Sequence, residues 1–193
     1  MQDRVTAPLI RAMKSRGDRV VVVTAYDYCS GQIADAAGVD AILVGDSVGN
    51  VMLGYDSTIP VTLDQMAHHV SACSAGVKRA HLIGDLPFGS YQSSVGTAVD
   101  SAVRLMQAGA QSVKLEGAYL DEIRGIAKAG IPVMGHLGFT PQSVNAFGGH
   151  KVQGKTNADE LVDTAKALED SGVYAMVLEL IPADLANRIS QSV

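Results

Sequence analysis

The sequence has 193 residues, of which 47% are hydrophobic and 18% charged, a balance typical of one globular domain with a substantial core. Its formal charge of -5 and its scattered Lys and Arg residues exclude the basic surface that a nucleic-acid-binding protein needs. No apolar run approaches the roughly 20 residues that cross a bilayer, and the charged segment 1–17 lacks the apolar stretch of a signal peptide. We therefore expect a cytoplasmic protein with a single domain at 1–193 and no membrane or nucleic-acid partner.

The first predicted element after the charged N-terminal segment is a buried strand at residues 20–24. Five more short apolar runs follow, each directly after a helical segment that ends in a small residue and glycine. Glycine is expected there because it adopts the left-handed conformation at a helix end without steric cost. The runs are VDAILVGD at 39–46, VKRAHLIGD at 77–85, AQSVKLEG at 110–117, IPVMGHLG at 131–138 and VYAMVLEL at 173–180. Their lengths are typical of buried parallel strands.

The segments between these strands have helical periodicity and carry residues that favour the start of a helix. These start signals are Thr62 with Gln65, Thr140 before Pro141, Asn157 with Glu160, and Pro182. Cys29 and Cys73 fall in two of the helical segments and are expected to be buried thiols. Alternating strands and helices predict a parallel sheet that is either doubly wound or closed into a barrel.

Two observations favour the barrel. The sequence TAYDYCSG after the first strand lacks the G-x-G-x-x-G spacing of a dinucleotide-binding loop. In addition, every apolar run ends in a side chain that can take part in chemistry: Asp27, Asp46, Asp85, Glu116, His136 and Glu179. In a (β/α)-barrel the carboxyl ends of all strands converge on one rim, so we expect these residues to meet there. Each aspartate, taken alone, is equally open to a role as a helix cap.

Acidic side chains at the ends of buried strands are costly to leave unpaired, so the set predicts a cation among them. Oxygen-rich sites of this kind suit Mg²⁺, although Mn²⁺ and other divalent ions also fit. Lys114 shares a strand face with Glu116 and could bind an anionic substrate; an ordinary ion pair between the two is the alternative. At a strand end, His136 is expected to contact substrate rather than metal. The other four histidines are expected to be structural.

Seven strings along the chain occur in the order found in one enzyme family. They are VTAYDY, VGDSVGN, GYDST-P-VT, GDLPFGSY, VKLEG, GHLGFTPQSVNAFGGHKVQG and LELIP. Together they resemble ketopantoate hydroxymethyltransferases and extend from about residue 21 to residue 182, nearly the whole chain. The long string from GHLG to KVQG is the most specific of them.

This resemblance implies a (β/α)8 TIM barrel of the phosphoenolpyruvate/pyruvate type that binds Mg²⁺ and assembles as a large homo-oligomer, a decamer. The reaction it implies is hydroxymethyl transfer from methylene-tetrahydrofolate to α-ketoisovalerate, which gives ketopantoate through a metal-stabilised enolate. Matched position by position, the resemblance implies metal-site roles for Asp46, Asp85 and Glu116, substrate contacts at Ser47, Asp85, Lys114 and His136, and an acid/base role for Glu179.

Glu179 is the expected base that removes the proton next to the keto group, provided that burial or neighbouring carboxylates raise its pKa. Lys114 and His136 would then stabilise the developing charge of the substrate. The glycine-flanked segment 148–155 has the composition of a mobile lid and equally that of a plain surface loop.

Eight strands close a barrel of this type, usually in about 250 residues, whereas this sequence predicts six strand-helix units. The last two units are therefore expected to be missing. Unpaired edge strands would make the chain poorly soluble or dependent on neighbouring copies. Two other functions stay open. One is a related Mg-dependent α-ketoacid carbon–carbon lyase or mutase, although the cysteine-bearing KKCGH-type lid string is absent here; the other is a non-catalytic fragment.

Overall fold

A computed structural model describes residues 4–193; residues 1–3, which belong to the expected 1–193 domain, lie outside the described residues. Six parallel strands form one sheet, and each strand pairs with the next one in the sequence. The strands are β1 (Val22–Thr24), β2 (Ala41–Val44), β3 (His81–Asp85), β4 (Ser112–Lys114), β5 (Val133–Gly138) and β6 (Val173–Glu179). The predicted alternation of parallel strands and helices is confirmed.

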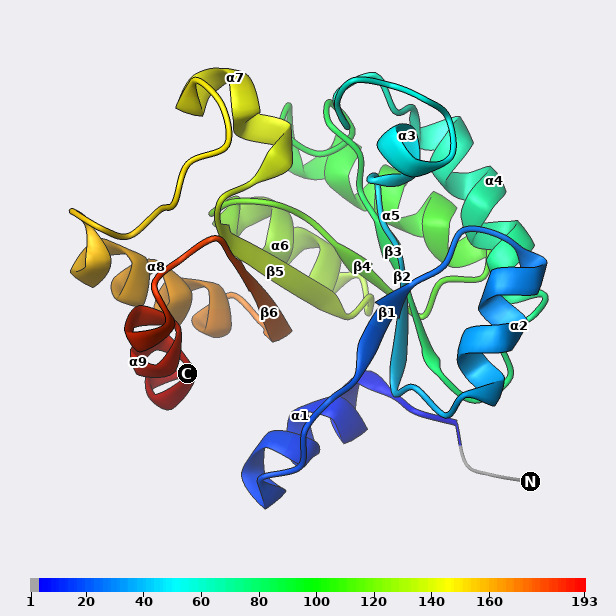
Figure 1. The fold of residues 1–193 in the computed structure, drawn as a ribbon, viewed down its shortest axis with the longest axis horizontal. Coiled ribbons are helices and arrows are strands. Elements are labelled where there is room, and N and C mark those ends of the chain that lie inside the picture. The colour runs from blue at the N-terminus through cyan, green and yellow to red at the C-terminus, as the bar shows by residue number, and fades with distance from the viewer. Residues whose placement is uncertain (1–3) are drawn as a thin grey trace.

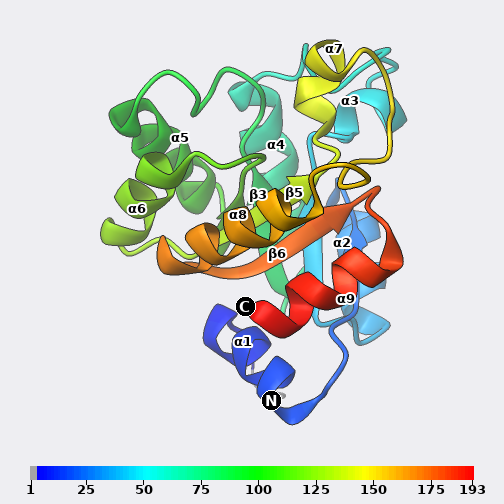
Figure 2. The same ribbon diagram turned by 90° about the vertical axis from the view of Figure 1, so that its left-hand side faces the viewer.

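Helices cover the outside and both ends of this sheet (Figures 1 and 2). They are α1 (Ala7–Arg16), α2 (Tyr28–Ala36), α3 (Val48–Val51), α4 (Leu63–Ser74), α5 (Val95–Gln107), α6 (Leu120–Lys128), the 3₁₀ turn η1 (Pro141–Ser143), α7 (Val144–Phe147), α8 (Ala158–Asp170) and α9 (Ala183–Ser192). In both views α1 lies at one end of the sheet, and α3 and α7 lie at the other, beyond the carboxyl ends of β2 and β5. Within residues 4–193, no helix has the length and apolar composition needed to cross a membrane.

The predicted helix-start residues Thr62 and Asn157 both take the N-cap position of a helix, but only the Thr62 side chain makes a capping hydrogen bond. Thr62 and Gln65 make the expected capping box: the Thr62 hydroxyl accepts from the Gln65 backbone N–H at 3.2 Å, and the Gln65 side chain accepts from the Thr62 N–H at 2.9 Å. Asn157 takes the N-cap position of α8, so the predicted helix start is confirmed, but its side chain makes no hydrogen bond to the helix backbone. Its amide instead donates to the Glu160 carboxylate at 3.4 Å.

The two cysteines have different environments. Cys73 is fully buried in α4, as predicted, and burial raises the pKa of its thiol to about 11. The same prediction is wrong for Cys29, which lies in the first turn of α2 and is exposed. Packing between these helices depends on Gly31, since a Cβ at that position would lie 2.8 Å from the Cys73 sulfur.

Strand side chains alternate between two apolar cores, as a sheet with two buried faces requires. The larger core lies between the sheet and the helices and includes Ile42, Val44, Leu82, Val113, Leu115 and Val133. A smaller core is formed by side chains on the opposite face of the strands, namely Ala41, Ile83 and Met134. They pack against Val5 and Ile10 from the α1 region. The sheet therefore curls around an interior that α1 covers at one end.

A β-bulge changes which side chains of β6 point into the interior of the sheet. Met134 of β5 pairs with Ala175 rather than with Tyr174, so Tyr174 is an extra residue, and both Tyr174 and Ala175 pack against the inner core. An extra residue reverses the alternation of every side chain after it. As a result Glu179, at the end of β6, faces the same side as His136 of β5.

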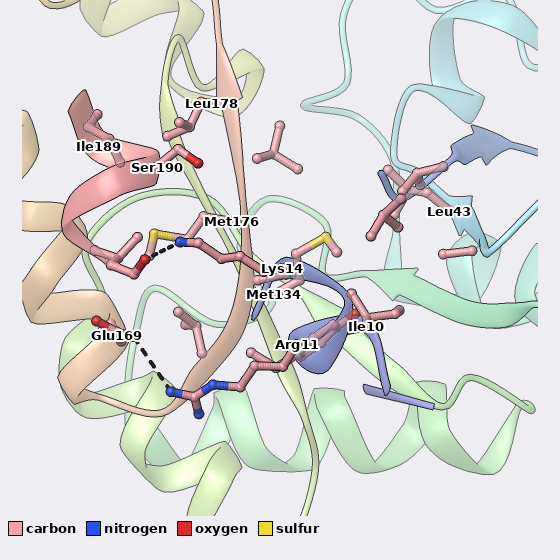
Figure 3. A pocket seen from close by; sticks show the side chains of 18 residues that line it. Ile10, Arg11, Lys14, Leu43, Met134, Glu169, Met176, Leu178, Ile189 and Ser190 are labelled. Carbon is pink, nitrogen blue, oxygen red and sulfur yellow. Dashed lines mark hydrogen bonds and ion pairs between the residues drawn. The ribbon is translucent and has the colours of Figure 1, made fainter. Parts of the chain in front are cut away.

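The two edge strands β1 and β6 line one cavity of about 400 Å³, whose walls are mostly apolar. Figure 3 shows Leu43 of β2 on one side of this cavity and Met176 of β6 and Ile189 of α9 on the other. Two polar contacts border it, the ion pair between Arg11 and Glu169 and a hydrogen bond from Lys14 to the C-terminal residue. The sheet is thus an open curl, in which no strand among the described residues pairs with the outer edge of β1 or β6.

Candidate active site

Five of the predicted site residues meet at the carboxyl ends of the strands. We refer to them as the Lys114 cluster; its members, all at most 4% exposed, are Asp46, Asp85, Lys114, Glu116 and His136. They come from the ends of β2, β3, β4 and β5, so consecutive parallel strands deliver them to one place. This is the convergence that the sequence pattern predicts.

The Lys114 ammonium lies at the centre of the cluster. Its Nζ is 2.9 Å from Asp85 Oδ1 and 3.9 Å from Glu116 Oε1. It also donates to His136 Nδ1 at 3.3 Å. The predicted proximity of Lys114 and Glu116 is therefore observed, but the shorter ion pair is with Asp85.

Burial and the excess of carboxylates over ammonium together raise several pKa values in the cluster. Burial disfavours the ammonium of Lys114, but Asp85, Glu116 and Asp46 outweigh it and raise the Lys114 pKa. Burial also raises the pKa of Asp85 well above its usual range, because Lys114 offsets only part of the burial and of the repulsion from the other carboxylates. For Glu116, burial raises the pKa to about 7 against the opposing effect of Lys114. An additional positive charge would stabilise this arrangement.

His136 connects the cluster to Glu179. Because an ammonium can only donate, His136 Nδ1 must accept from Lys114, and the neutral ring carries its hydrogen on Nε2. Burial lowers the pKa of His136, although Glu179 opposes this effect, and the neutral form is favoured. Its Nε2 lies 3.3 Å from Glu179 Oε2. The Glu179 side chain is 39% exposed, so it is only partly buried.

Asp46 and Ser47 follow β2, and backbone as well as side-chain contacts hold this segment beside the cluster. The Asp46 N–H donates to Asp85 Oδ2 at 3.2 Å. The Ser47 hydroxyl is 2.8 Å from the Tyr26 hydroxyl, so a tyrosine from the loop after β1 fixes its position. A Cβ at Gly45 would lie 2.9 Å from Ser47 Oγ, so a larger residue there would displace this hydroxyl.

Asp27 does not join the cluster. Its side chain accepts from the Ser30 N–H at 2.7 Å, while the Ser30 hydroxyl accepts from the Asp27 N–H at 3.2 Å, which forms a capping box at the start of α2. These hydrogen bonds lower the pKa of Asp27. For this one strand-end residue, the helix-cap interpretation was correct.

Two further residues of the site, Gln142 and Tyr91, were not identified from the sequence. Gln142 is 4% exposed, and its amide donates to Asp46 Oδ2 at 2.8 Å. Tyr91 is 1% exposed, and its hydroxyl accepts from the Glu116 N–H at 3.2 Å. Both lie in the quoted strings GDLPFGSY and GHLGFTPQSVN, but neither is at a strand end: Tyr91 is in a loop and Gln142 is in η1. A search for polar residues within those strings would have found them.

The cluster fits a metal ion held by few protein ligands. In residues 4–193, no group of three His, Cys, Asp or Glu side chains is arranged as a ready-made metal site. Mg²⁺ is usually bound through one or two carboxylates, with water and substrate oxygens in its remaining positions. Asp46 and Asp85, with Glu116 beside them, supply such carboxylates around a single ammonium. The arrangement suits binding of a metal-associated anionic substrate and proton removal by the exposed Glu179.

Comparison with known sequences identifies close relatives. A family model described as ketopantoate hydroxymethyltransferase matches residues 4–193. Proteins named 3-methyl-2-oxobutanoate hydroxymethyltransferase are 52% identical in Carboxydothermus hydrogenoformans and 54% identical in both Anaeromyxobacter sp. and Moorella thermoacetica. The matches cover 99%, 97% and 98% of this chain, and 71%, 64% and 72% of the respective relatives. The chain thus spans about two thirds to three quarters of the length of these relatives.

Solved structures show the same fold at low sequence identity. A 2,3-dimethylmalate lyase, described as a PEP mutase/isocitrate lyase superfamily member, has a TM-score of 0.70 at 20% identity, over 97% of this chain and 68% of that one. An oxaloacetate acetylhydrolase has a TM-score of 0.72 at 14% identity, over 100% and 70%. These likenesses confirm the predicted (β/α)-barrel fold, of which the chain forms six units.

Proposed function

The chain belongs to the ketopantoate hydroxymethyltransferase family, and on that premise we propose that it transfers a hydroxymethyl group from methylene-tetrahydrofolate to α-ketoisovalerate to give ketopantoate. The observation that supports this most directly is the buried Lys114 cluster, which adjoins the exposed carboxylate of Glu179 through His136. Enolising an α-ketoacid requires a cationic environment for the keto oxygen and a base beside it. The cluster and Glu179 offer both.

We assign the divalent cation, Mg²⁺ in the first instance, to Asp46 and Asp85, with Glu116 completing its surroundings. Three buried carboxylates face one ammonium, so a divalent cation would balance charge that Lys114 alone does not. The chemistry that Mg²⁺ supplies when bound is Lewis-acid polarisation of the keto and carboxylate oxygens of the substrate. Asp85 thus serves both the metal and, through it, the substrate.

Lys114, His136 and Ser47 are the proposed substrate contacts. Lys114 keeps its charge among the carboxylates and would attract the negative charge that develops on the substrate. Ser47, held by the Tyr26 hydroxyl, offers a hydrogen bond at the rim of the same site. Neutral His136 carries its hydrogen on Nε2, which makes no hydrogen bond to the described residues and would donate to the substrate; Glu179 Oε2 lies 3.3 Å from it.

Glu179 is the proposed base. Its carboxylate would accept a proton from the β-carbon of α-ketoisovalerate, and that carbon would then form the new bond to the one-carbon unit. The bonds from that unit to the folate nitrogens would break, which releases tetrahydrofolate, and water would supply the hydroxyl group. Its partial exposure leaves it accessible from the open side of the site, where the second substrate would approach. The bulge in β6 is what directs this side chain inward.

Family membership also supports three finer proposals: a folate as the one-carbon donor, assembly as a homo-oligomer such as a decamer, and a cytoplasmic location. We further propose that residues 1–193 form a single barrel domain. Sedimentation of the purified chain with and without α-ketoisovalerate would test the oligomeric state.

Deuterium exchange at the β-carbon of α-ketoisovalerate, followed by NMR in D₂O with Mg²⁺, tests the proposed chemistry. The unmodified chain should catalyse exchange, and Glu179→Gln should slow it by at least about a hundredfold, the usual effect of removing a general base. Glu160→Gln, on the exposed face of α8, is the matched control and should exchange normally. Undiminished exchange in Glu179→Gln would exclude Glu179 as the base. If the unmodified chain neither exchanged this proton nor formed ketopantoate, the proposed function would be wrong.

A further inference from the structure

Gln142 lies at the point where three strand ends meet. It belongs to η1, the turn that follows β5, and its side chain is buried. Its amide Nε2 donates to Asp46 Oδ2 at 2.8 Å and to the backbone oxygen of Leu86 at 3.0 Å. Its backbone N–H donates to Glu116 Oε2 at 2.9 Å. One residue therefore binds two of the carboxylates assigned to the metal site, from β2 and from the end of β4.

The orientation of this amide is determined by its other partners. Gln142 Oε1 accepts from the Tyr91 hydroxyl at 2.7 Å and from Gln92 Nε2 at 3.2 Å. Both hydrogens and both lone pairs of the amide are thus used. A flipped amide would place its oxygen against the Asp46 carboxylate and its NH₂ group against that of Gln92. The network therefore permits only the orientation in which Gln142 donates to Asp46.

These hydrogen bonds leave a defined part of each carboxylate for other ligands. With Oδ2 of Asp46 bound by the amide, Oδ1 is the atom left for a cation. With Oε2 of Glu116 bound by the backbone N–H of Gln142, Oε1 is left facing Lys114 at 3.9 Å and His136 Nδ1 at 3.6 Å. Partners of this kind, which bind a ligating side chain from behind, fix its direction and strengthen metal binding.

We propose that Gln142 is a positioning residue that orients Asp46 and Glu116 toward the divalent cation, and that Tyr91 acts with it by fixing the direction of the amide. The proposal rests on the proposed function, since it takes these carboxylates as the metal site. The turn after β5 would then contribute to metal affinity together with the carboxylates at the strand ends.

Mn²⁺ binding, measured by electron paramagnetic resonance on the full chain without substrate, tests the proposal apart from catalysis. Gln142→Asn keeps an amide but shortens the side chain by one methylene, so it cannot reach Asp46 and Tyr91 together. Binding of Mn²⁺ should weaken about tenfold, as is usual when an outer partner of a metal ligand is lost. Gln153→Asn, in the same connecting segment, is the control that should bind Mn²⁺ normally, because the Gln153 side chain donates to the backbone oxygen of Lys151 and to none of the cluster residues.

In the exchange assay, Gln142→Asn should raise the Mg²⁺ concentration needed for half-maximal rate more than it raises the KM for α-ketoisovalerate. Unchanged Mn²⁺ affinity in this variant would overturn the proposal. If Gln142→Asn does not fold, Tyr91→Phe decides the question, because it removes only the hydroxyl that fixes the amide. A folded Tyr91→Phe chain with weaker Mn²⁺ binding supports the proposal, and one with unchanged binding overturns it.

The same experiment separates this inference from the proposed function. If the unmodified chain binds Mn²⁺ and both variants bind it with the same affinity, the role of Gln142 is overturned and the proposed function stands. A lack of any Mn²⁺ or Mg²⁺ binding by the unmodified chain would overturn both.

Discussion

His81 lies inside the curled sheet at the start of β3, four residues before Asp85, and its environment differs from that of the acidic end. The side chain is 2% exposed, and Nε2 is 2.9 Å from the Ser112 hydroxyl, which is in turn 3.0 Å from the Tyr174 hydroxyl. Burial lowers the pKa of His81 from 6.5 to about 4. The interior of the sheet thus holds a neutral histidine at one end and a charged group at the other.

Stability should therefore fall on acidification through the titration of His81. Between pH 6.5 and pH 4 the unfolded chain binds a proton at this residue that the folded chain does not, so the free energy of unfolding decreases as the pH falls. The loss between pH 7 and pH 5 should be about 2 kcal/mol. Urea unfolding at pH 7 and pH 5 measures how far the free energy of unfolding falls in the unmodified chain and in His81→Asn. The difference between the two decreases is the contribution of His81.

His68→Asn, on the exposed face of α4, provides the control and should keep the pH dependence of the unmodified chain. The carboxylates with raised pKa values act in the opposite direction, but they are common to all three proteins and cancel in the comparison. If the free energy of unfolding fell equally with pH in the unmodified chain and in His81→Asn, His81 would not be the source of the pH dependence.

At the level of single residues, the sequence predicted the strand-end groups and missed those that support them. Asp46, Asp85 and Lys114 could be found because a buried strand that ends in a charged residue is an unusual pattern. Gln142 and Tyr91 do not follow this pattern. The quoted strings contain them, but only their contacts in the structure distinguish them from the other polar residues of those strings. Asp27 has the same strand-end position as Asp46, and only its contacts identify it as a cap.

At the level of elements, the β5–β6 junction determines where Glu179 lies. Gly138 ends β5 with a φ of +90°, and a Cβ there would lie 2.2 Å from the Glu179 backbone oxygen. The neighbouring Phe139 N–H donates to that same oxygen at 2.8 Å. Only glycine allows the two strands to stay this close where His136 and Glu179 meet.

Gly138→Ala should therefore separate the ends of β5 and β6. Combined overpacking and left-handed strain should cost about 3 kcal/mol in the free energy of unfolding, and exchange at the β-carbon should fall with it. Gly130→Ala is the matched control: its φ is +85° but nothing lies within 4 Å of the added Cβ, so only the strain of about 1 kcal/mol applies. Equal destabilisation by the two substitutions, in urea unfolding, would contradict the role of close packing.

The strand order and most helix boundaries could be predicted because glycine at helix ends and short apolar runs are local signals. The bulge at Tyr174 could not, since an extra residue in β6 is visible only from its pairing with β5. Strict alternation along VYAMVLEL would place Tyr174 and Glu179 on opposite faces, whereas the structure turns both toward the interior.

At the level of the whole molecule, the open sides of the curled sheet expose apolar surface. Val21 and Val22 at the β1 edge are 52% and 43% exposed, and the cavity between β1 and β6 has mostly apolar walls. Unpaired strand edges of this kind favour pairing with another chain. We expect the 193-residue chain to self-associate, with an apparent mass in light scattering that rises with protein concentration.

Val22→Lys places a charge on the β1 edge and should reduce this association, because charged edge residues oppose strand pairing. Val152→Lys is its control: this valine has the same 43% exposure but lies in the segment before α8, away from both edges. A chain that stays monomeric and melts cooperatively at every concentration would contradict the expectation.

Pairing of each strand only with its neighbours in the sequence also has a consequence for folding during synthesis. A newly made unit finds its partner strand already in place, so the sheet can grow one unit at a time from the N-terminus. The ion pair of Asp85 with Lys114 becomes possible once β4 has been added, whereas Glu179 arrives only with β6. A nascent chain could thus form the Asp85–Lys114 ion pair before the proposed base, Glu179, is present.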